Sequence, residues 1–247
     1  MNILILLIIL YFILYVGLHS AKQKIYFQPN IECNGYPVDI PDIWVSGLHA
    51  WYLKSNKTDK TILYFHGNAG NIGSRIDTLY KWHDQGFSIV LYDYPGYGMS
   101  KGYPTEKSLY DSGDKMIEYL LSHINKENII LYGESIGCPV ATHVANSHDI
   151  SRIVLQSGFS SMKEMASILI PWWLDWFLPF IDDFNTYKLL SKYTGDVMLL
   201  HSKDDDIVPY EHAVRLTDFT TNLREIYGSH NQPVIEINPV VKFMIRK

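Results

Sequence analysis

The sequence has few cysteines and no excess of positive charge, and both features exclude classes of protein. Only two of its 247 residues are cysteine, Cys33 and Cys138, which is too few for a scaffold held together by disulfides. Cys138 lies in a segment compatible with a helix, so we expect a small, buried, apolar thiol there. The formal net charge of -5 provides no basic surface, which argues against a nucleic-acid partner.

Internal repeats and low-complexity tracts are also absent after residue 20. A chain of 247 residues suits one large α/β domain better than two small ones, and it can bury a sizeable core. Hydrophobic residues make up 47% and charged residues 19%, which is typical of a globular and not a disordered chain. We therefore assign residues 21–247 to a single folded domain.

The first twenty residues form an apolar segment. Residues 3–18 are apolar or aromatic apart from one glycine, and Lys22 and Lys24 follow. A bilayer span takes about 20 apolar residues, so this run is short for one. No positive charge precedes it and residues 18–20 are a poor cleavage site, so we expect residues 1–20 to be an uncleaved membrane anchor. The alternatives are a signal peptide, which would leave a secreted or periplasmic domain, and a buried helix.

Beyond the anchor, short buried strands alternate with helices. The predicted strands are continuous apolar runs, as in a parallel sheet covered on both faces. Several of these predicted strands are followed by segments whose apolar residues recur at helical spacing. This alternation predicts an α/β fold with a mostly parallel central sheet and right-handed crossovers. The predicted strands are 61–65, 87–91, 129–132, 153–155, 197–200 and 223–227, after a strand or hairpin arm at 43–53.

One stretch interrupts the alternation, and we interpret residues 158–195 as a small helical cap over the sheet. Its centre, 168–181, is apolar apart from Asp175 and rich in aromatic residues. The functional interpretations are an acyl-binding lid or a surface that dips into the bilayer interface. The alternative is ordinary packing of a long excursion. The candidate substrate-binding residues in it are Trp172, Trp173, Trp176 and Phe177.

The chain is organised around the pentapeptide Gly133-Glu134-Ser135-Ile136-Gly137. It follows an apolar strand and precedes a helix, the arrangement of a nucleophile elbow. In such a turn the serine has a strained backbone, and glycines at both ends avoid clashes. The Ser135 hydroxyl is then exposed above the edge of the sheet, which makes it the candidate nucleophile.

A serine hydroxyl needs a base, and the base needs a carboxylate to orient it. In this kind of fold the chain order is serine, acid, histidine. The acid follows the strand at 197–200, where three aspartates are adjacent, and the spacing D-x-x-V-P selects Asp205. We expect Asp204 and Asp206 to be solvated. His230 is the candidate base because it lies in a glycine-containing loop after the last strand.

Two main-chain amides are candidates for the oxyanion hole. Ile136 begins the helix after the nucleophile, where the helix dipole also favours negative charge. The second donor is expected after His66-Gly67, most simply Asn68, with Ala69 as the alternative.

The chain resembles the α/β-hydrolase superfamily in five motifs. In order they are H-G-N-A-G-N (66–71), D-Y-P-G-Y-G-M-S-K-G (93–102), G-E-S-I-G (133–137), D-D-I-V-P (205–209) and G-S-H-N (228–231). The likeness covers residues 40–231. More narrowly, the chain is similar to the small, N-terminally anchored branch related to the yeast bud-emergence hydrolase and the mammalian depalmitoylating enzymes.

The resemblance implies a catalytic triad of Ser135, Asp205 and His230, with no cofactor and no metal. Pro233 and Pro239 interrupt the short segment after His230, which argues against the closing helix usual in the family.

The sequence thus predicts a membrane-anchored serine hydrolase that cleaves esters or thioesters of acyl chains. Its predicted partners are a small-molecule or acylated substrate and the membrane, contacted through residues 3–18 and through the aromatic cap. The alternatives are an aminopeptidase or amidase with the same triad, and a non-catalytic membrane scaffold.

Overall fold

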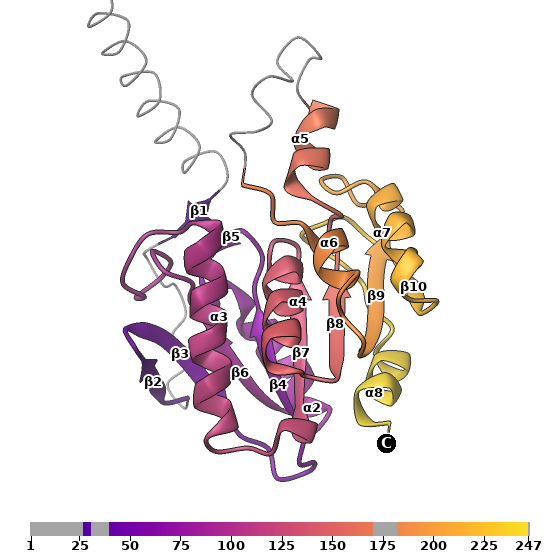
Figure 1. Ribbon diagram of the computed structural model, residues 1–247. Helices are drawn as coiled ribbons and strands as arrows, with labels where there is room; N and C mark the ends of the chain where they lie inside the picture. Colours follow the sequence, from indigo (N-terminus) through magenta and orange to yellow (C-terminus); the bar gives the residue numbers. More distant parts are fainter. Residues whose placement is uncertain (1–26, 31–39, 170–181, 247) are drawn as a thin grey trace, which may run out of the picture.

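A computed structural model describes residues 27–30, 40–169 and 182–246 (Figure 1). Eight strands form one sheet in the order β10-β9-β8-β7-β4-β6-β3-β2. β2 and β3 form an antiparallel hairpin and β3 is antiparallel to β6, whereas the other neighbours are parallel. Their bounds are β2 Asp42–Val45, β3 Leu48–Leu53, β4 Thr61–Phe65, β6 Ser88–Tyr92, β7 Ile129–Glu134, β8 Arg152–Gln156, β9 Asp196–Ser202 and β10 Leu223–Ile226.

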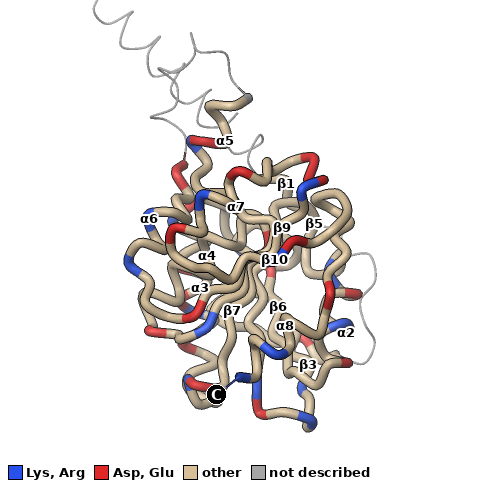
Figure 2. Tube along the Cα trace, turned by 90° about the vertical axis from the view of Figure 1, so that its right-hand side faces the viewer, with Lys and Arg blue, Asp and Glu red and all other residues tan. Residues whose placement is uncertain are grey.

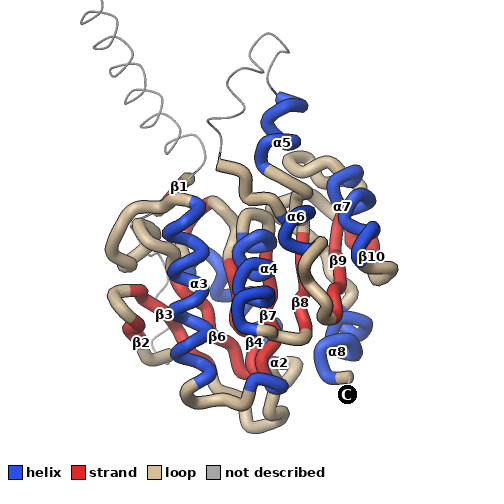
Figure 3. Tube along the Cα trace, viewed as in Figure 1, coloured by secondary structure: helices blue, strands red, loops and turns tan. Residues whose placement is uncertain are grey.

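Helices cover both faces of this sheet. Figures 1 and 3 show α3 and α4 in front of the strands. The helices are α2 Ile76–Asp84, α3 Glu106–Leu121, α4 Gly137–His148, α5 Met162–Leu169, α6 Thr186–Leu190, α7 Tyr210–Leu216 and α8 Ile237–Ile245, with short 3-10 turns η1 Ile72–Arg75, η2 Lys126–Asn128 and η4 Thr217–Phe219.

Strand β4 illustrates why the central strands read as continuous apolar runs. Leu63 and Phe65 belong to the apolar cluster shared with α3 and α4, and Ile62 and Tyr64 belong to the cluster shared with α2 and α8. All five residues of β4 are buried, because helices lie on both sides of it. The predicted α/β architecture, a mostly parallel sheet flanked by helices, is confirmed.

The predicted cap is described only in part. Helices α5 and α6 belong to residues 158–195, and Figure 1 shows α5 above the carboxyl ends of the strands. The four aromatic residues proposed to bind substrate lie outside the described residues, as does the predicted anchor at 1–20. In the part of the chain that the structure describes, no helix combines the length and apolarity needed to cross a bilayer.

The prediction against a closing helix is wrong. Helix α8 runs from Ile237 to Ile245, and Pro239 is its third residue. Proline is tolerated there because the N–H groups of the first turn have no carbonyl acceptor within the helix. Val240, Phe243 and Met244 are buried against the sheet, so tertiary packing stabilises this short helix.

Charged residues of both signs are dispersed over the surface. Figure 2 shows lysine and arginine interspersed with aspartate and glutamate around the fold. The large single-sign field of a nucleic-acid-binding surface is not seen in this view of the described residues.

A buried histidine joins the edge hairpin to the loop after β6. The two ring nitrogens of His49 lie 2.8 Å from Asp42 Oδ1 and 3.2 Å from Asp93 Oδ2, and the His49 side chain is fully buried. Burial opposes protonation of the ring, but hydrogen bonds to Asp93 and Asp42 outweigh it and raise the pKa of His49. The positively charged form of His49 is therefore favoured in the folded state.

We expect His49→Gln to lower the free energy of unfolding by about 3 kcal/mol in mildly acidic solution, because a buried ion pair loses one partner. A histidine whose pKa is raised on folding stabilises the protein below its unfolded pKa, and this contribution is lost as the pH rises through the folded pKa. Urea unfolding of wild type and variant at about pH 6 and about pH 9 measures the difference, which should narrow at the higher pH.

The matched control is His123→Gln, because His123 is exposed. A stability difference for His49→Gln that is the same at both pH values would contradict the charged pair.

Candidate active site

The nucleophile elbow is formed by close contact between β7, β4 and α4. Ser135 has φ of 53°, a left-handed conformation, and its amide donates to the Gln156 carbonyl at 2.9 Å. A Cβ atom on Gly137 would lie 2.1 Å from the Phe65 carbonyl oxygen, and one on Gly133 would lie 2.6 Å from the Gly137 oxygen. Only glycine fits at these two positions, as the sequence predicts.

Ser135, His230 and Asp205 are brought together from three separate segments of the chain. The Ser135 Oγ lies 3.1 Å from His230 Nε2. On the other side of the ring, His230 Nδ1 lies 2.8 Å from Asp205 Oδ2 and 3.0 Å from Oδ1. With the proton on Nδ1, His230 donates to the carboxylate and accepts from the serine hydroxyl. This is the hydrogen-bond order that activates a serine nucleophile.

The loop after β9 holds Asp205 as a buried carboxylate. Its Oδ1 accepts from the amides of Ile207 at 3.0 Å and Val208 at 2.7 Å, and its side chain is fully buried. Burial alone would raise the pKa of Asp205, but the His230 hydrogen bond and these two amides hold it below its usual value. The carboxylate therefore stays ionised beside His230.

The neighbouring residues of this loop have different roles. Asp204 is exposed, as predicted. Asp206 is exposed too, but its Oδ1 accepts from the main-chain amide of His230 at 3.0 Å, so the prediction of a merely solvated side chain is incomplete. The buried His201 lies 2.9 Å from the Val208 carbonyl through Nε2, and burial lowers its pKa. A neutral His201 thus supports the loop that carries Asp205.

Both predicted oxyanion donors have a main-chain amide that is available. Within the described residues, the main-chain N–H groups of Ile136 and Asn68 donate no hydrogen bond. The Asn68 side chain has a separate structural role, because its Oδ1 accepts from the Gln28 amide at 3.3 Å and from the Tyr97 hydroxyl at 2.9 Å. Gln28–Pro29, strand β1, pairs with strand β5, Ala69–Gly70, and further restrains this loop.

The side chain of His66 supports the same loop through buried contacts. Its Nδ1 lies 2.7 Å from the Gly67 carbonyl, and Tyr94 donates to the His66 carbonyl at 3.0 Å. Burial, aided by the Arg75 charge, lowers the pKa of His66 to about 4, so the ring is neutral at physiological pH. The His66 and Tyr94 rings lie 4.2 Å apart, centroid to centroid. These contacts orient the peptide that precedes Asn68.

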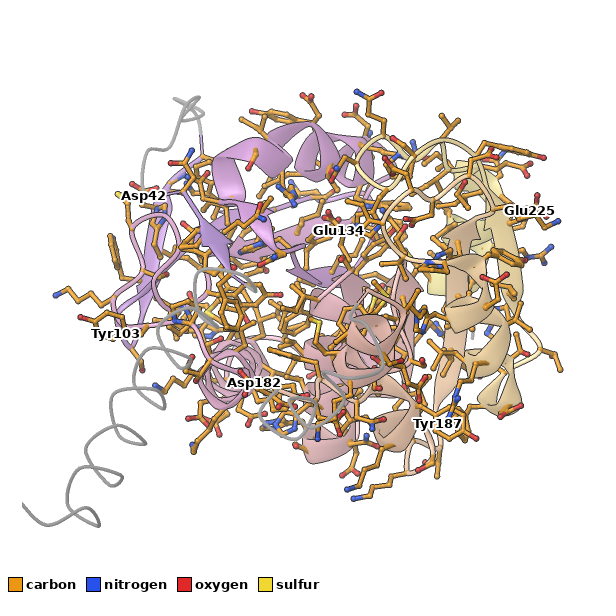
Figure 4. All side chains as sticks on the ribbon, turned by 90° about the horizontal axis from the view of Figure 1, so that it is seen from above. Asp42, Tyr103, Glu134, Asp182, Tyr187 and Glu225 are labelled. Carbon is orange, nitrogen blue, oxygen red and sulfur yellow. The ribbon has the colours of Figure 1, made fainter. Side chains whose placement is uncertain are left out.

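Glu134 connects the elbow to the loop after β4, residues 66–71, which carries the candidate oxyanion donor Asn68 and is called the oxyanion loop below. Its carboxylate accepts from the Tyr64 hydroxyl at 2.8 Å and pairs with Arg75 Nη2 at 3.2 Å. Arg75 also donates through Nη1 to the Ala69 carbonyl at 2.9 Å. Burial would raise the pKa of Glu134, but Arg75 and Tyr64 hold it below its usual value. Figure 4 places Glu134 near the centre of this end of the molecule, whereas Tyr103 and Glu225 lie at its rim.

Sequence reasoning did not identify Arg75, Tyr64 or Asp93 as site residues. Asp93 Oδ1 accepts from the Ile72 amide at 2.9 Å, and a Cβ atom on Gly98 would lie 2.1 Å from Asp93 Oδ2. The available signal was the motif D-Y-P-G-Y-G, which places an aspartate at a strand end ahead of two glycines. Nothing in the local sequence around Arg75 pairs it with Glu134.

His143 in α4 contacts α3 and not the candidate triad. Its Nε2 lies 3.1 Å from Asp114 on α3, and its ring stacks on Tyr110. In the described ranges, no group of three or more His, Cys, Asp or Glu residues is arranged to hold a metal ion.

The chain matches a known protein family and is similar in sequence to curated proteins. Residues 60–190 match the family model for the alpha/beta hydrolase fold. An uncharacterized protein of Acanthamoeba polyphaga mimivirus is 30% identical over 208 residues, which cover 73% of this chain and 70% of that protein. An uncharacterized membrane protein of Saccharomyces cerevisiae is 30% identical over 201 residues, 76% of this chain and 71% of the relative.

Among solved structures, an esterase of Pyrococcus furiosus is similar in fold. The two structures have a TM-score of 0.65 at 17% sequence identity, with 88% of this chain and 98% of the esterase covered.

Proposed function

The chain belongs to the alpha/beta hydrolase fold family, and from this we propose that it is a serine hydrolase of carboxylic esters or thioesters with acyl chains. The observation that carries the proposal is the hydrogen-bonded series Ser135 Oγ, His230 Nε2, His230 Nδ1 and Asp205, with separations of 3.1 and 2.8 Å. A scaffold protein has no need of a strained serine at such a turn.

In the proposed reaction, Ser135 Oγ bonds to the substrate carbonyl carbon while His230 accepts the hydroxyl proton. The oxyanion accepts hydrogen bonds from the amides of Asn68 and Ile136, each worth about 2.7–4 kcal/mol of transition-state stabilisation. His230 then returns the proton to the departing alcohol or thiol, which leaves an acyl-enzyme. Water, activated by His230, attacks the acyl carbon and releases the carboxylic acid and free Ser135.

Two considerations favour esters or thioesters over amides. The fold neighbour from Pyrococcus furiosus is an esterase, and the apolar excursion in this chain has no clear charged anchor for a peptide terminus. We propose that Trp172, Trp173, Trp176 and Phe177 contact the acyl chain. An aminopeptidase or amidase with the same triad is the rival activity, and it would release amines from peptides.

We also propose that the chain is a member of the N-terminally anchored branch of the family that includes the depalmitoylating enzymes. In this proposal, residues 1–20 hold the protein on a membrane. The run of apolar residues at 3–18 supports it, as does the yeast relative described as a membrane protein.

We expect the full chain to sediment with membranes and to resist extraction by alkaline carbonate. A chain starting at residue 21 should be released under the same conditions, since it lacks the apolar segment. Immunoblots of pellet and supernatant measure the partition, and release of the full chain by carbonate would contradict the anchor.

We expect Ser135→Ala to lose covalent labelling by a fluorophosphonate and nearly all turnover. The residual rate is about 10³–10⁴-fold over water, supplied by binding and the oxyanion hole. The measurement is hydrolysis of nitrophenyl esters from two to sixteen carbons, with wild type beside the variant. A folded wild-type protein that neither labels nor turns over would favour the scaffold. Labelling without ester turnover, together with amine release from peptides, would favour the amidase.

We expect Asp205→Asn to lower kcat by about 10⁴-fold, because the amide no longer fixes the His230 tautomer or stabilises the imidazolium. Asp204→Asn is the matched control, because Asp204 is an exposed neighbour without a contact to His230. Single-turnover hydrolysis of one nitrophenyl ester compares the three proteins. Equal losses in both variants would mean that Asp205 has no special role.

A further inference from the structure

A cavity of about 340 Å³ lies beside His230, on the face of the sheet covered by α2 and α8. One wall is the base loop, from His230 to Pro233. The lining also includes Ala69 of the oxyanion loop, residues of η1 and α2, and Glu134 and Gln156 at the ends of β7 and β8. The cavity is therefore bordered by the loops that carry the nucleophile, the oxyanion donor and the base.

The proposed reaction determines which part of a substrate faces this cavity. The departing atom must receive its proton from His230 Nε2, so the alcohol or thiol lies on the His230 side of the carbonyl carbon. His230 itself lines the cavity, together with Ala69 of the oxyanion loop, so we infer that a group attached to the departing atom enters it. The acyl chain extends from the other side of the carbonyl carbon.

The lining is polar and carries one unpaired positive charge. The Glu134 charge is compensated by Arg75 at 3.2 Å. The other positively charged side chain of the lining is Lys81. Within the described residues it forms no ion pair, and its Nζ lies 5.9 Å from the centre of the Trp82 ring. Gln156 uses its Oε1 to accept from Tyr132 at 2.6 Å, so its amide group is available as a donor.

We propose that this cavity is the leaving-group subsite and that it selects alcohols or thiols bearing a carboxylate or phosphate, recognised by Lys81. The inference rests on the proposed function and adds the chemical class of the leaving group. An ammonium on a flexible stem suits a point-charge contact to such an anion. A cationic leaving group would be repelled by the same charge.

The test uses three thioesters with one acyl chain: the S-butyryl derivatives of 3-mercaptopropionate, 2-mercaptoethanol and thiocholine. Their leaving groups are anionic, neutral and cationic. The rate of thiol release gives kcat/KM for each thioester. Each kcat/KM is then divided by the rate constant for alkaline hydrolysis of the same thioester, which corrects for differences in intrinsic reactivity. We expect wild type to prefer the anionic over the neutral thioester by about fivefold, the size expected of one half-exposed ion pair.

Lys81→Gln should abolish this preference, and Lys81→Glu should reverse it toward thiocholine. The matched control is Lys54→Gln, because Lys54 is also a lysine beside an aromatic ring, 5.1 Å from that of Tyr52, but lies outside the cavity. It should retain the wild-type ratios. Circular dichroism and fluorophosphonate labelling check that each variant is folded.

The outcomes separate this inference from the proposed function. If wild type cleaves the three thioesters at equal normalised rates, or if Lys81→Gln keeps the anionic preference, the subsite is wrong and the hydrolase stands. If no thioester releases thiol and Ser135 does not label, the proposed function fails and this inference fails with it.

Discussion

The candidate site depends on one steric constraint, the close approach of α4 to the carboxyl end of β4. A Cβ atom on Gly137 would lie 2.1 Å from the Phe65 carbonyl, so the helix can begin there only with glycine. That approach forces the turn in which Ser135 has φ of 53° and places Ile136 ahead of the helix with its amide available. The candidate nucleophile and one candidate oxyanion donor are thus positioned by the same contact, which is also part of the core.

Buried or half-buried carboxylates then hold the loops at this end of the sheet. Asp93 pairs with His49 and accepts from the first amide of η1. Glu134, in the elbow, pairs with Arg75. Asp205, in the loop after β9, pairs with His230. Each carboxylate has a positive or hydrogen-bonding partner that compensates for burial. These loops lack regular secondary structure, but the buried charges fix the positions of their side chains. In a low-dielectric environment an unpaired charge is costly, so each carboxylate keeps its partner.

Several elements follow directly from local patterns, and others do not. The buried strands and the glycines of the elbow are readable because apolar runs and tight turns leave few choices of residue. The closing helix was misjudged because Pro239 reads as a break, whereas packing of Val240 and Phe243 stabilises the helix and the first turn tolerates proline. The Asp206 bond to the His230 amide joins residues 24 apart, and no local pattern signals it.

By itself, the sequence determined the fold class and the identity of Ser135, Asp205 and His230 as candidates, because motif spacing and chain order reflect local geometry. Only the tertiary structure decided that these three side chains are within hydrogen-bond reach, and which charges remain unpaired around them. The physical reason is that Arg75 and Glu134 are 59 residues apart in sequence and meet only when β7 lies beside β4. Among the described residues that line the cavity beside His230, that pairing leaves Lys81 as the positive charge without an ion-pair partner.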